Sequence, residues 1–525
     1  MRGQMIWDRH GAFAQRGMLV ICLAILVTVL VVSAPAPALA EEPIPSLEEV
    51  ERLEGPEEAA FGEMPERSIR YGSDALLVEE VRASANAFFP LIQAFRLESE
   101  SRMSARQSKA GAFDPRLSLE GDVRPLGFYE NWSGAGALEQ PTQLWGSRFS
   151  LRYRGSDGDF PSYDGGRLTD SSGEVAVGVE VPLLRGGLID KNRAALRGAE
   201  IKRASFTPEL ELELIKVIRA ATLSYWDWVA TGRVVEVVED LLEVAEERQS
   251  QIARRVEQGS EARINLRDNL RLVVERRARL RGAQRDFRQA TFKLSLFLRD
   301  AMGERRIVDA SNLPREFPDE MLLNPINIEA DLTRARSEHP RLQKLALERE
   351  RLLLDLKLAK NDVLPKLNMG LEGSRDFGGS RAGIDETGKL SSDSRSATEV
   401  KMKMKFELPV RLREARGRLG VARIRLEQLD RRIHFAEGEI ETEALIALEA
   451  LEAAYDQTIF ARENLSLANF LRDAEARKLG AGLSNLIDLN IRENQAASAA
   501  QNLVKAQQDY FRSLAEYRAR VATDA

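Results

Sequence analysis

Residues 399–409 read Glu-Val-Lys-Met-Lys-Met-Lys-Phe-Glu-Leu-Pro, with apolar and charged residues alternating up to the proline. A period of two predicts a β-strand with one apolar and one polar face. A similar stretch at residues 174–182 reads Glu-Val-Ala-Val-Gly-Val-Glu-Val-Pro and also ends in Glu-x-Pro. Matching strand ends in the two halves of the chain suggest an internal repeat.

Two further matches support this repeat. Residues 90–115 align with residues 340–365 without a gap, and both segments begin and end with proline. Residues 254–259 match residues 477–482, and both begin with arginine and end with glycine. All these matches occur in the same order, so each half is expected to contain a helix, strands joined by a loop, a long helix, a glycine turn and a second long helix.

The repeat predicts how the chain is divided. We expect a first repeat over residues 76–300, a linker over 301–327 and a second repeat over 328–525. Strands are expected at about 115–123, 147–154 and 174–182 in the first repeat, and at about 365–372 and 399–408 in the second.

Long amphipathic helices are predicted between the strands and the turns. Residues 187–257 and 413–478 are rich in Ala, Leu, Glu and Arg at helical spacing, and 261–300 and 484–522 form the return arms. Pro208 is expected to kink or divide the first of these helices. Helices of this length pair as coiled coils or form the wall of an elongated structure.

The N-terminus has the pattern of a secretory signal peptide over residues 1–40. Three arginines precede the apolar stretch 18–33, and Ala38-Leu39-Ala40 gives a small-residue cleavage site before Glu41. The acidic, proline-containing segment 41–75 is expected to be a flexible extension. No later stretch is long and apolar enough for a transmembrane helix, so the mature chain is either exported and soluble or spans a membrane by strands.

Composition argues against several classes of function. The chain has 76 Lys and Arg against 82 Asp and Glu, a net charge of −6, which is unlike a general nucleic-acid binder. It has three His and one Cys, too few for a Cys/His zinc site or a cysteine nucleophile. We therefore predict no enzyme, and no catalytic, cofactor-binding or metal-binding residues.

Other conspicuous residues have ordinary structural interpretations. Tyr225-Trp226-Asp227-Trp228 is expected to be an aromatic packing stripe, and Arg276-Arg277-Ala278-Arg279 a solvated coiled-coil face. His339 and His434 are expected on helix surfaces.

The strand pattern alone fits two environments equally well: a membrane, or a water-soluble hairpin packed on the helices. Closed membrane barrels need about 8 strands or more. One chain has too few, and an open edge is forbidden in lipid, so a barrel would be shared among copies. Four strands from each of three chains give roughly 12, and an even number can alternate in direction around a closed barrel. Five strands from each chain give roughly 15, and an odd number cannot. The stretch 147–154 is therefore expected to extend a loop hairpin. A dense group of aromatic residues between Phe128 and Tyr163 resembles an interfacial girdle.

The signal peptide, the duplicated unit, the strand ends Val181-Pro182-Leu183 and Leu408-Pro409-Val410, and the turns at Gly259 and Gly482 together resemble the TolC family of outer-membrane efflux proteins. The resemblance covers residues 76–522. It implies a mainly α fold with a small β part: a homotrimer whose long antiparallel helical hairpins form a periplasmic tunnel below a shared barrel of about 12 strands in outer-membrane lipid. It further implies an exit duct that works with a periplasmic adaptor and an inner-membrane transporter to expel small molecules or proteins, without a cofactor.

The resemblance also assigns roles to six residues. Adaptors of the family dock on the periplasmic turns, which here contain Arg255, Gly259, Lys478 and Gly482. A family aspartate that narrows the tunnel entrance falls on Asp488, and the matching position in the first repeat is Asn265. The alternative interpretation of Asp488 is an ordinary solvated acidic residue at a helix start, without a role in the tunnel. Two other gating positions of the family fall on Ile491 and Ser484, so the closed state is expected to differ.

Two alternative functions stay open at this stage. A periplasmic adaptor or coiled-coil scaffold also contains long hairpin helices, but adaptors lack duplicated strand pairs with long glycine-rich loops. A secreted enzyme would need a nucleophile or metal motif that the sequence does not contain.

Overall fold

The computed structural model describes residues 75–161, 168–378, 383–384, 390–391 and 397–523. The predicted signal peptide, and the acidic extension up to residue 74, lie outside these residues. The chain divides into two compact units. Described residues 110–193 and 360–412 form a strand unit, and described residues 75–109, 194–359 and 413–523 form a helical unit.

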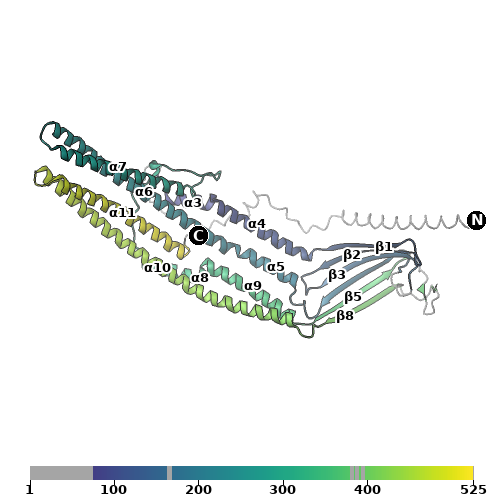
Figure 1. Cartoon of the computed structure of the whole chain (residues 1–525). Coiled ribbons are helices and arrows are strands. Elements are labelled where there is room, and N and C mark those ends of the chain that lie inside the picture. Colours follow the sequence, from purple (N-terminus) through teal and green to yellow (C-terminus); the bar gives the residue numbers. More distant parts are fainter. Residues whose placement is uncertain (1–74, 162–167, 379–382, 385–389, 392–396, 524–525) are drawn as a thin grey trace, which may run out of the picture. The chain divides into compact units, whose positions relative to one another are not determined.

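The helical unit is built on two long antiparallel hairpins. One consists of α6 (Phe206–Glu257) and α7 (Arg263–Leu294), and the other of α10 (Arg413–Gly480) and α11 (Leu486–Arg520). Within each hairpin the two helices lie side by side, and α11 also packs on α6 (Figure 1). The other α-helices of the described residues are α3 (Val78–Phe88), α4 (Pro90–Ala110), α5 (Lys191–Ala204), α8 (Pro325–Glu338) and α9 (Pro340–Asp362).

The predicted division near Pro208 is confirmed. The helical run is interrupted at Ser205, between α5 and α6. Pro208 lies in the first turn of α6, where a helix has unpaired N–H groups and a missing donor costs little.

Aromatic side chains form the centre of the helical unit. The rings of Trp226 and Phe511 stack at 4.2 Å between centroids, and Phe317 stacks on both of them. Trp228 is completely buried in the same cluster, and Tyr225 donates a hydrogen bond from its hydroxyl to the carbonyl of Leu76. The expected aromatic packing stripe at 225–228 is therefore confirmed as core.

The strand unit contains one six-stranded antiparallel sheet with the order β1-β2-β3-β4-β5-β8. The strands follow the chain order across the sheet, except that β5 pairs with β8 rather than with β6, and β5 also pairs directly with β4 from the first half. A small separate hairpin, β6 (Gly383–Ile384) with β7 (Leu390–Ser391), lies between β5 and β8 in sequence. The six strands are β1 (Arg116–Arg124), β2 (Asn131–Pro141), β3 (Arg148–Gly158), β4 (Glu174–Pro182), β5 (Lys366–Asp376) and β8 (Thr398–Glu407).

The expected strand count is wrong. We predicted about four sheet strands, with 147–154 as part of a loop hairpin, but β3 lies inside the sheet between β2 and β4. The prediction missed β2 because its sequence, Asn-Trp-Ser-Gly-Ala-Gly-Ala-Leu-Glu-Gln-Pro, is rich in glycine and alanine and has little hydrophobic contrast. Its backbone pairs with β1 and β3 on both sides, and these ladders outweigh the low strand propensity of glycine.

Within the part of the chain that the structure describes, no helix is long and apolar enough to cross a membrane.

Candidate functional site

The sheet has one apolar face that extends over all six strands. In every strand the alternate residues on this face are mainly aliphatic, aromatic or glycine, and the register sets them side by side. One row contains Leu117, Leu138, Leu151 and Val177 across β1 to β4, and a second contains Val179, Leu371 and Met402 across β4 to β8.

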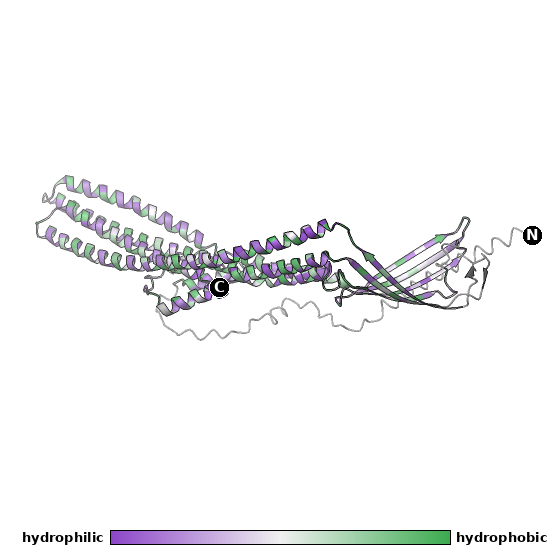
Figure 2. Ribbon diagram, turned by 90° about the horizontal axis from the view of Figure 1, so that it is seen from below, coloured by the Kyte–Doolittle hydropathy of each residue, from purple (hydrophilic) through white to green (hydrophobic). Residues whose placement is uncertain are grey.

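This apolar face is exposed. Its more exposed side chains range from 41% accessible at Leu138 to 72% at Val400. Figure 2 shows the hydrophobic and hydrophilic residues alternating along the strands. A continuous apolar surface of this extent is unusual in a water-soluble protein and is typical of strands that contact lipid.

The opposite face of the sheet is polar and cross-linked by ion pairs. Arg148 lies 3.3 Å from Glu180, and Arg154 lies 2.6 Å from Glu174, each pair joining β3 to β4. Arg152 of β3 reaches across β4 to pair with a carboxylate on β5, Glu372, at 2.8 Å. Such a face suits contact with water rather than with hydrocarbon.

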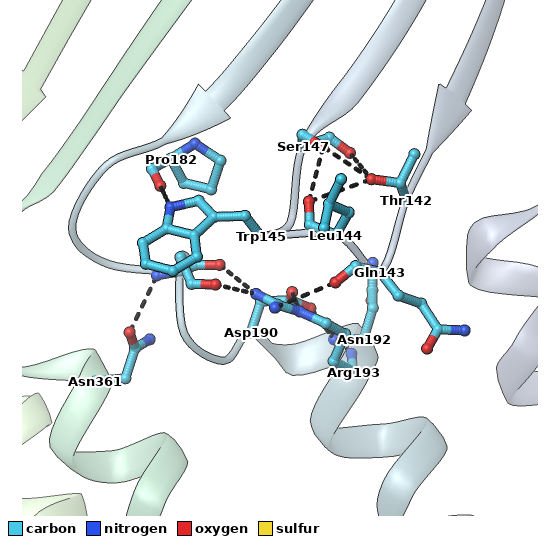
Figure 3. Close-up of polar contacts among 12 residues, drawn as sticks. Thr142, Gln143, Leu144, Trp145, Ser147, Pro182, Asp190, Asn192, Arg193 and Asn361 are labelled. Atoms are coloured by element: carbon cyan, nitrogen blue, oxygen red, sulfur yellow. Dashed lines mark hydrogen bonds and ion pairs between the residues drawn. The ribbon is translucent and has the colours of Figure 1, made fainter.

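An aromatic residue is fixed at one end of the sheet. Trp145 lies in the turn between β2 and β3, with a φ of 53°, and its indole N–H donates to the carbonyl of Pro182 at 2.9 Å (Figure 3). The loop after β4 is held by Arg193, which contacts the Asp190 carboxylate and the carbonyl of Gly186, both at 2.5 Å. Tryptophan with an apolar ring and a bonded N–H is typical of a membrane–water interface.

The two helical turns are built in the same way. Gly259 has a φ of +75° and Gly482 a φ of +77°, the left-handed conformation that favours glycine. In the first turn the N–H of Ser260 donates to the carbonyl of Arg255 at 2.9 Å; in the second the N–H of Leu483 donates to that of Lys478 at 2.9 Å. Both are Schellman motifs, so backbone geometry supports the sequence match between these turns.

Asp488 lies in the first turn of α11 and is exposed. The side-chain oxygen of Asn485 accepts hydrogen bonds from the N–H groups of Ile487 and Asp488 and caps the helix, and the amide of Asn485 donates to the Asp488 carboxylate at 2.9 Å. Asn265 occupies the equivalent place in α7, where its amide donates to Glu261 at 2.5 Å. Asp488 is therefore both a helix-start acid and an exposed carboxylate beside the turn.

Ser484, one of the two other gating positions that the resemblance assigns, has a local role in the structure. Its hydroxyl donates to Glu475 at the end of α10. This hydrogen bond lowers the pKa of the Glu475 carboxyl, with a further contribution from Lys478. The contact therefore ties the two sides of the turn together.

A buried ionic cluster joins the two hairpins, and the sequence analysis missed it. Glu493 of α11 pairs with Arg276 of α7 at 3.0 Å and with Arg248 of α6. Arg276 is 1% exposed and also donates to the carbonyl of Leu241 at 2.5 Å. Burial lowers the pKa of Arg276, and the contact with Glu493 opposes that shift. The expectation that Arg276 belongs to a solvated face is wrong, because its side chain is buried where it contacts Leu241 of α6 and Glu493 of α11.

Among the described residues, no group of three or more His, Cys, Asp or Glu side chains is arranged to hold a metal ion.

The second half of the chain matches a known family. Residues 332–520 match the family described as outer membrane efflux protein. This part of the chain is an outer membrane efflux protein domain. The domain runs from α8 to the end of α11, so it contains β5, β8 and the turn at Gly482. No curated protein matches the sequence.

Solved structures share the fold over most of the chain. The outer-membrane channel OprN is 13% identical, with a TM-score of 0.60 over 85% of this chain and 89% of its own. The open state of the MtrE outer membrane channel of Neisseria gonorrhoeae is 14% identical, with a TM-score of 0.58 over 85% and 88%. The CmeC outer membrane channel of Campylobacter jejuni is 11% identical, with a TM-score of 0.57 over 85% of both chains.

The efflux protein domain confirms the resemblance to the TolC family and the outer-membrane location predicted from the sequence. The family and the shared fold indicate an outer-membrane efflux channel. A mainly α fold with a small antiparallel sheet is also confirmed.

Proposed function

We propose that three copies of the chain form an exit duct through the outer membrane, with the sheet in lipid and the long helices forming a tunnel in the periplasm. The observation that carries this proposal is the exposed apolar face over six strands, backed by a polar face with ion pairs. Lipid covers the first face and water fills the lumen lined by the second. Trp145 anchors one border of the apolar face.

The duct is passive in this proposal. It works with a periplasmic adaptor and an inner-membrane transporter, and the transporter supplies the energy and selects the exported small molecule or protein. The adaptor docks at the turns containing Arg255, Gly259, Lys478 and Gly482. The matched Schellman geometry of these turns supports this role, because both hairpins then present similar backbone to one partner.

Asp488 narrows the tunnel entrance in this proposal, and Asn265 takes the equivalent place on the other hairpin. The exposed position of Asp488 beside the turn supports this assignment. Three symmetry-related carboxylates make a ring that favours cations.

The two halves are proposed to be repeats, first over 76–300 and then over 328–525. Each contains a helix, antiparallel strands, and a long helical hairpin closed by a glycine Schellman turn.

The test combines membrane fractionation with conductance in planar bilayers. In fractionated cells the protein is expected in the outer-membrane fraction. After purification it is expected to form stable pores in planar bilayers without a nucleotide. A soluble periplasmic monomer without pore activity would contradict the duct and favour the adaptor or scaffold alternative.

A further inference from the structure

The two outer strands of the sheet have unpaired edges. In the order β1-β2-β3-β4-β5-β8, the outer edges of β1 and β8 pair with no other strand in the part of the chain that the structure describes. Six strands are fewer than the roughly 8 of the smallest membrane barrels. A free edge in hydrocarbon would leave backbone N–H and C=O groups without partners. Both edges therefore need a partner beyond the strands that the structure describes, and a second copy of the chain offers one.

The polar face of β8 carries a central column of lysines. Lys403 lies directly opposite Gly370 of β5, and Lys405 lies opposite Asn368. Neither lysine faces an acidic residue across the ladder within its own sheet. The full polar series along β8 is Glu399, Lys401, Lys403, Lys405 and Glu407.

The polar face of β1 carries the opposite charge at its centre. Glu120 lies directly opposite Ala135 of β2, and Asp122 lies opposite Ser133. No basic residue on β2 faces either acid, although Asp122 has an ion pair of 3.4 Å with Arg124 on the same strand. The full polar series along β1 is Arg116, Ser118, Glu120, Asp122 and Arg124.

We propose that β8 of one copy pairs antiparallel with β1 of the next copy, in the register that places Lys403 opposite Glu120. The inference rests on the proposed trimeric duct and specifies how its copies join. In the two polar series of β8 and β1, every charged residue except Lys405 then faces an opposite charge across the junction, and Lys405 faces a serine. The pairs are Glu399 with Arg124, Lys401 with Asp122, Lys403 with Glu120, Lys405 with Ser118, and Glu407 with Arg116.

The apolar face agrees with the same register. It sets Phe406 opposite Leu117, and Met404 opposite Leu119, so the apolar surface continues across the junction between copies. Opposite charges and apolar pairs directly across an antiparallel ladder are both stabilising.

Neighbouring registers are disfavoured by like charges. A shift that sets Lys403 opposite Ser118 places Lys405 opposite Arg116. The reverse shift, with Lys403 opposite Asp122, places Lys401 opposite Arg124. Like charges directly opposite destabilise a sheet, and a shift by one residue would turn the apolar residues to the wrong face.

This junction fixes the number of strands in the shared barrel. Six strands from each of three copies give 6 × 3 = 18, all alternating in direction. The resemblance to the TolC family implies about 12 strands, and barrel diameter grows with strand number. The extra strands, β2 and β3, therefore widen the exit of the duct.

Cysteine pairs test the register. The single cysteine of the sequence, Cys22, lies in the predicted signal peptide, so introduced cysteines have no competitors in the mature chain. The double variant Glu120→Cys with Lys403→Cys is expected to give reducible covalent trimers under mild oxidation or with a short bis-thiol reagent. The matched controls, Ser118→Cys or Asp122→Cys with Lys403→Cys, are expected to react at least several-fold less.

A charge exchange provides a second test that needs no introduced cysteine. Lys403→Glu is expected to lower the temperature at which the trimer dissociates, and adding Glu120→Lys to restore most of the loss. An outer-membrane trimer that cross-links best in a shifted pair, or in none, overturns the proposed junction but leaves the duct intact. A wild-type chain that forms no outer-membrane oligomer overturns both. A trimer imaged with a barrel of 12 strands overturns the proposed barrel of 18 strands.

Discussion

Glu493 and Arg276 are charged residues that the helical unit buries almost completely. Two guanidinium groups, those of Arg276 and Arg248, share the Glu493 carboxylate. The helical period predicts only which face of a helix a residue occupies. It does not predict that a third helix covers a charged face, so this cluster could be found only in the structure.

Replacing Glu493 by alanine is expected to destabilise the protein strongly. It leaves Arg276 buried without its carboxylate partner, and breaking a buried pair costs about 3–5 kcal/mol. The free energy of unfolding of the purified protein in chaotrope measures this loss.

The matched control is Glu246→Ala, which removes the exposed partner of Arg277. An exposed pair contributes less than about 1 kcal/mol. Equal losses in the two variants would contradict the importance of burial.

Replacing Asp488 by asparagine is expected to lower the cation selectivity of the reconstituted pore, because a ring of negative charge is removed from the entrance. The reciprocal variant Asn265→Asp is expected to raise the cation selectivity, because it adds a second ring of carboxylates. Reversal potentials in a salt gradient measure both effects. An unchanged reversal potential in Asp488→Asn would remove this residue from the constriction and leave it a helix-start acid.

His339 predicts a pH dependence of stability. It is buried rather than on a helix surface, which corrects the expectation from sequence, and its Nδ1 accepts a hydrogen bond from the N–H of Arg341 at 3.1 Å. Burial, with a contribution from the Arg341 charge, lowers its pKa, and Glu443 opposes the shift. The folded state therefore favours neutral His339, and stability is lost as pH falls below the ordinary value near 6.5.

The variant His339→Asn is expected to reduce this loss, because asparagine caps a helix without titrating. The loss of stability between pH 7.5 and 5.5 is therefore expected to be smaller in the variant than in wild type. Thermal unfolding at the two pH values measures it. Identical pH dependence in both proteins would show that His339 does not contribute.

The turns and the strands differ in how far sequence could predict them. Each turn has a glycine at the position that needs a positive φ, so its place followed from local chemistry. The strands β4 and β8 were equally clear, because polar and apolar residues alternate. The strand β2 was not, because a run of glycine and alanine forms a strand only when both neighbours supply ladder partners.

Replacing Gly482 by alanine is expected to cost roughly 1–2 kcal/mol, because a side chain strains the left-handed conformation at +77°. It is also expected to weaken adaptor binding. The control Gly438→Ala lies inside α10 with open space around the added methyl group, and is expected to stabilise by up to about 1 kcal/mol. Thermal unfolding and adaptor pull-down measure both. A neutral Gly482→Ala in both assays would contradict the role of this turn.

For the whole molecule, the sequence predicted the long helices, the strands β1, β4, β5 and β8 in their order, and the family of the second half. It could not predict the number of sheet strands, because that number depends on pairing between distant segments such as β4 and β5. The same limit applies beyond the chain. The proposed trimer in lipid would pair the edges of β1 and β8, which have no partner among the described residues, and would cover the exposed apolar face.

The mass of the particle extracted from the outer membrane in mild detergent tests the trimeric duct most directly. Native mass spectrometry is expected to give three copies of the mature chain, and no smaller species at low dissociation energy. A monomer or dimer from that fraction would contradict the shared duct, since neither supplies the three carboxylates at the entrance or the 18 strands of the proposed barrel.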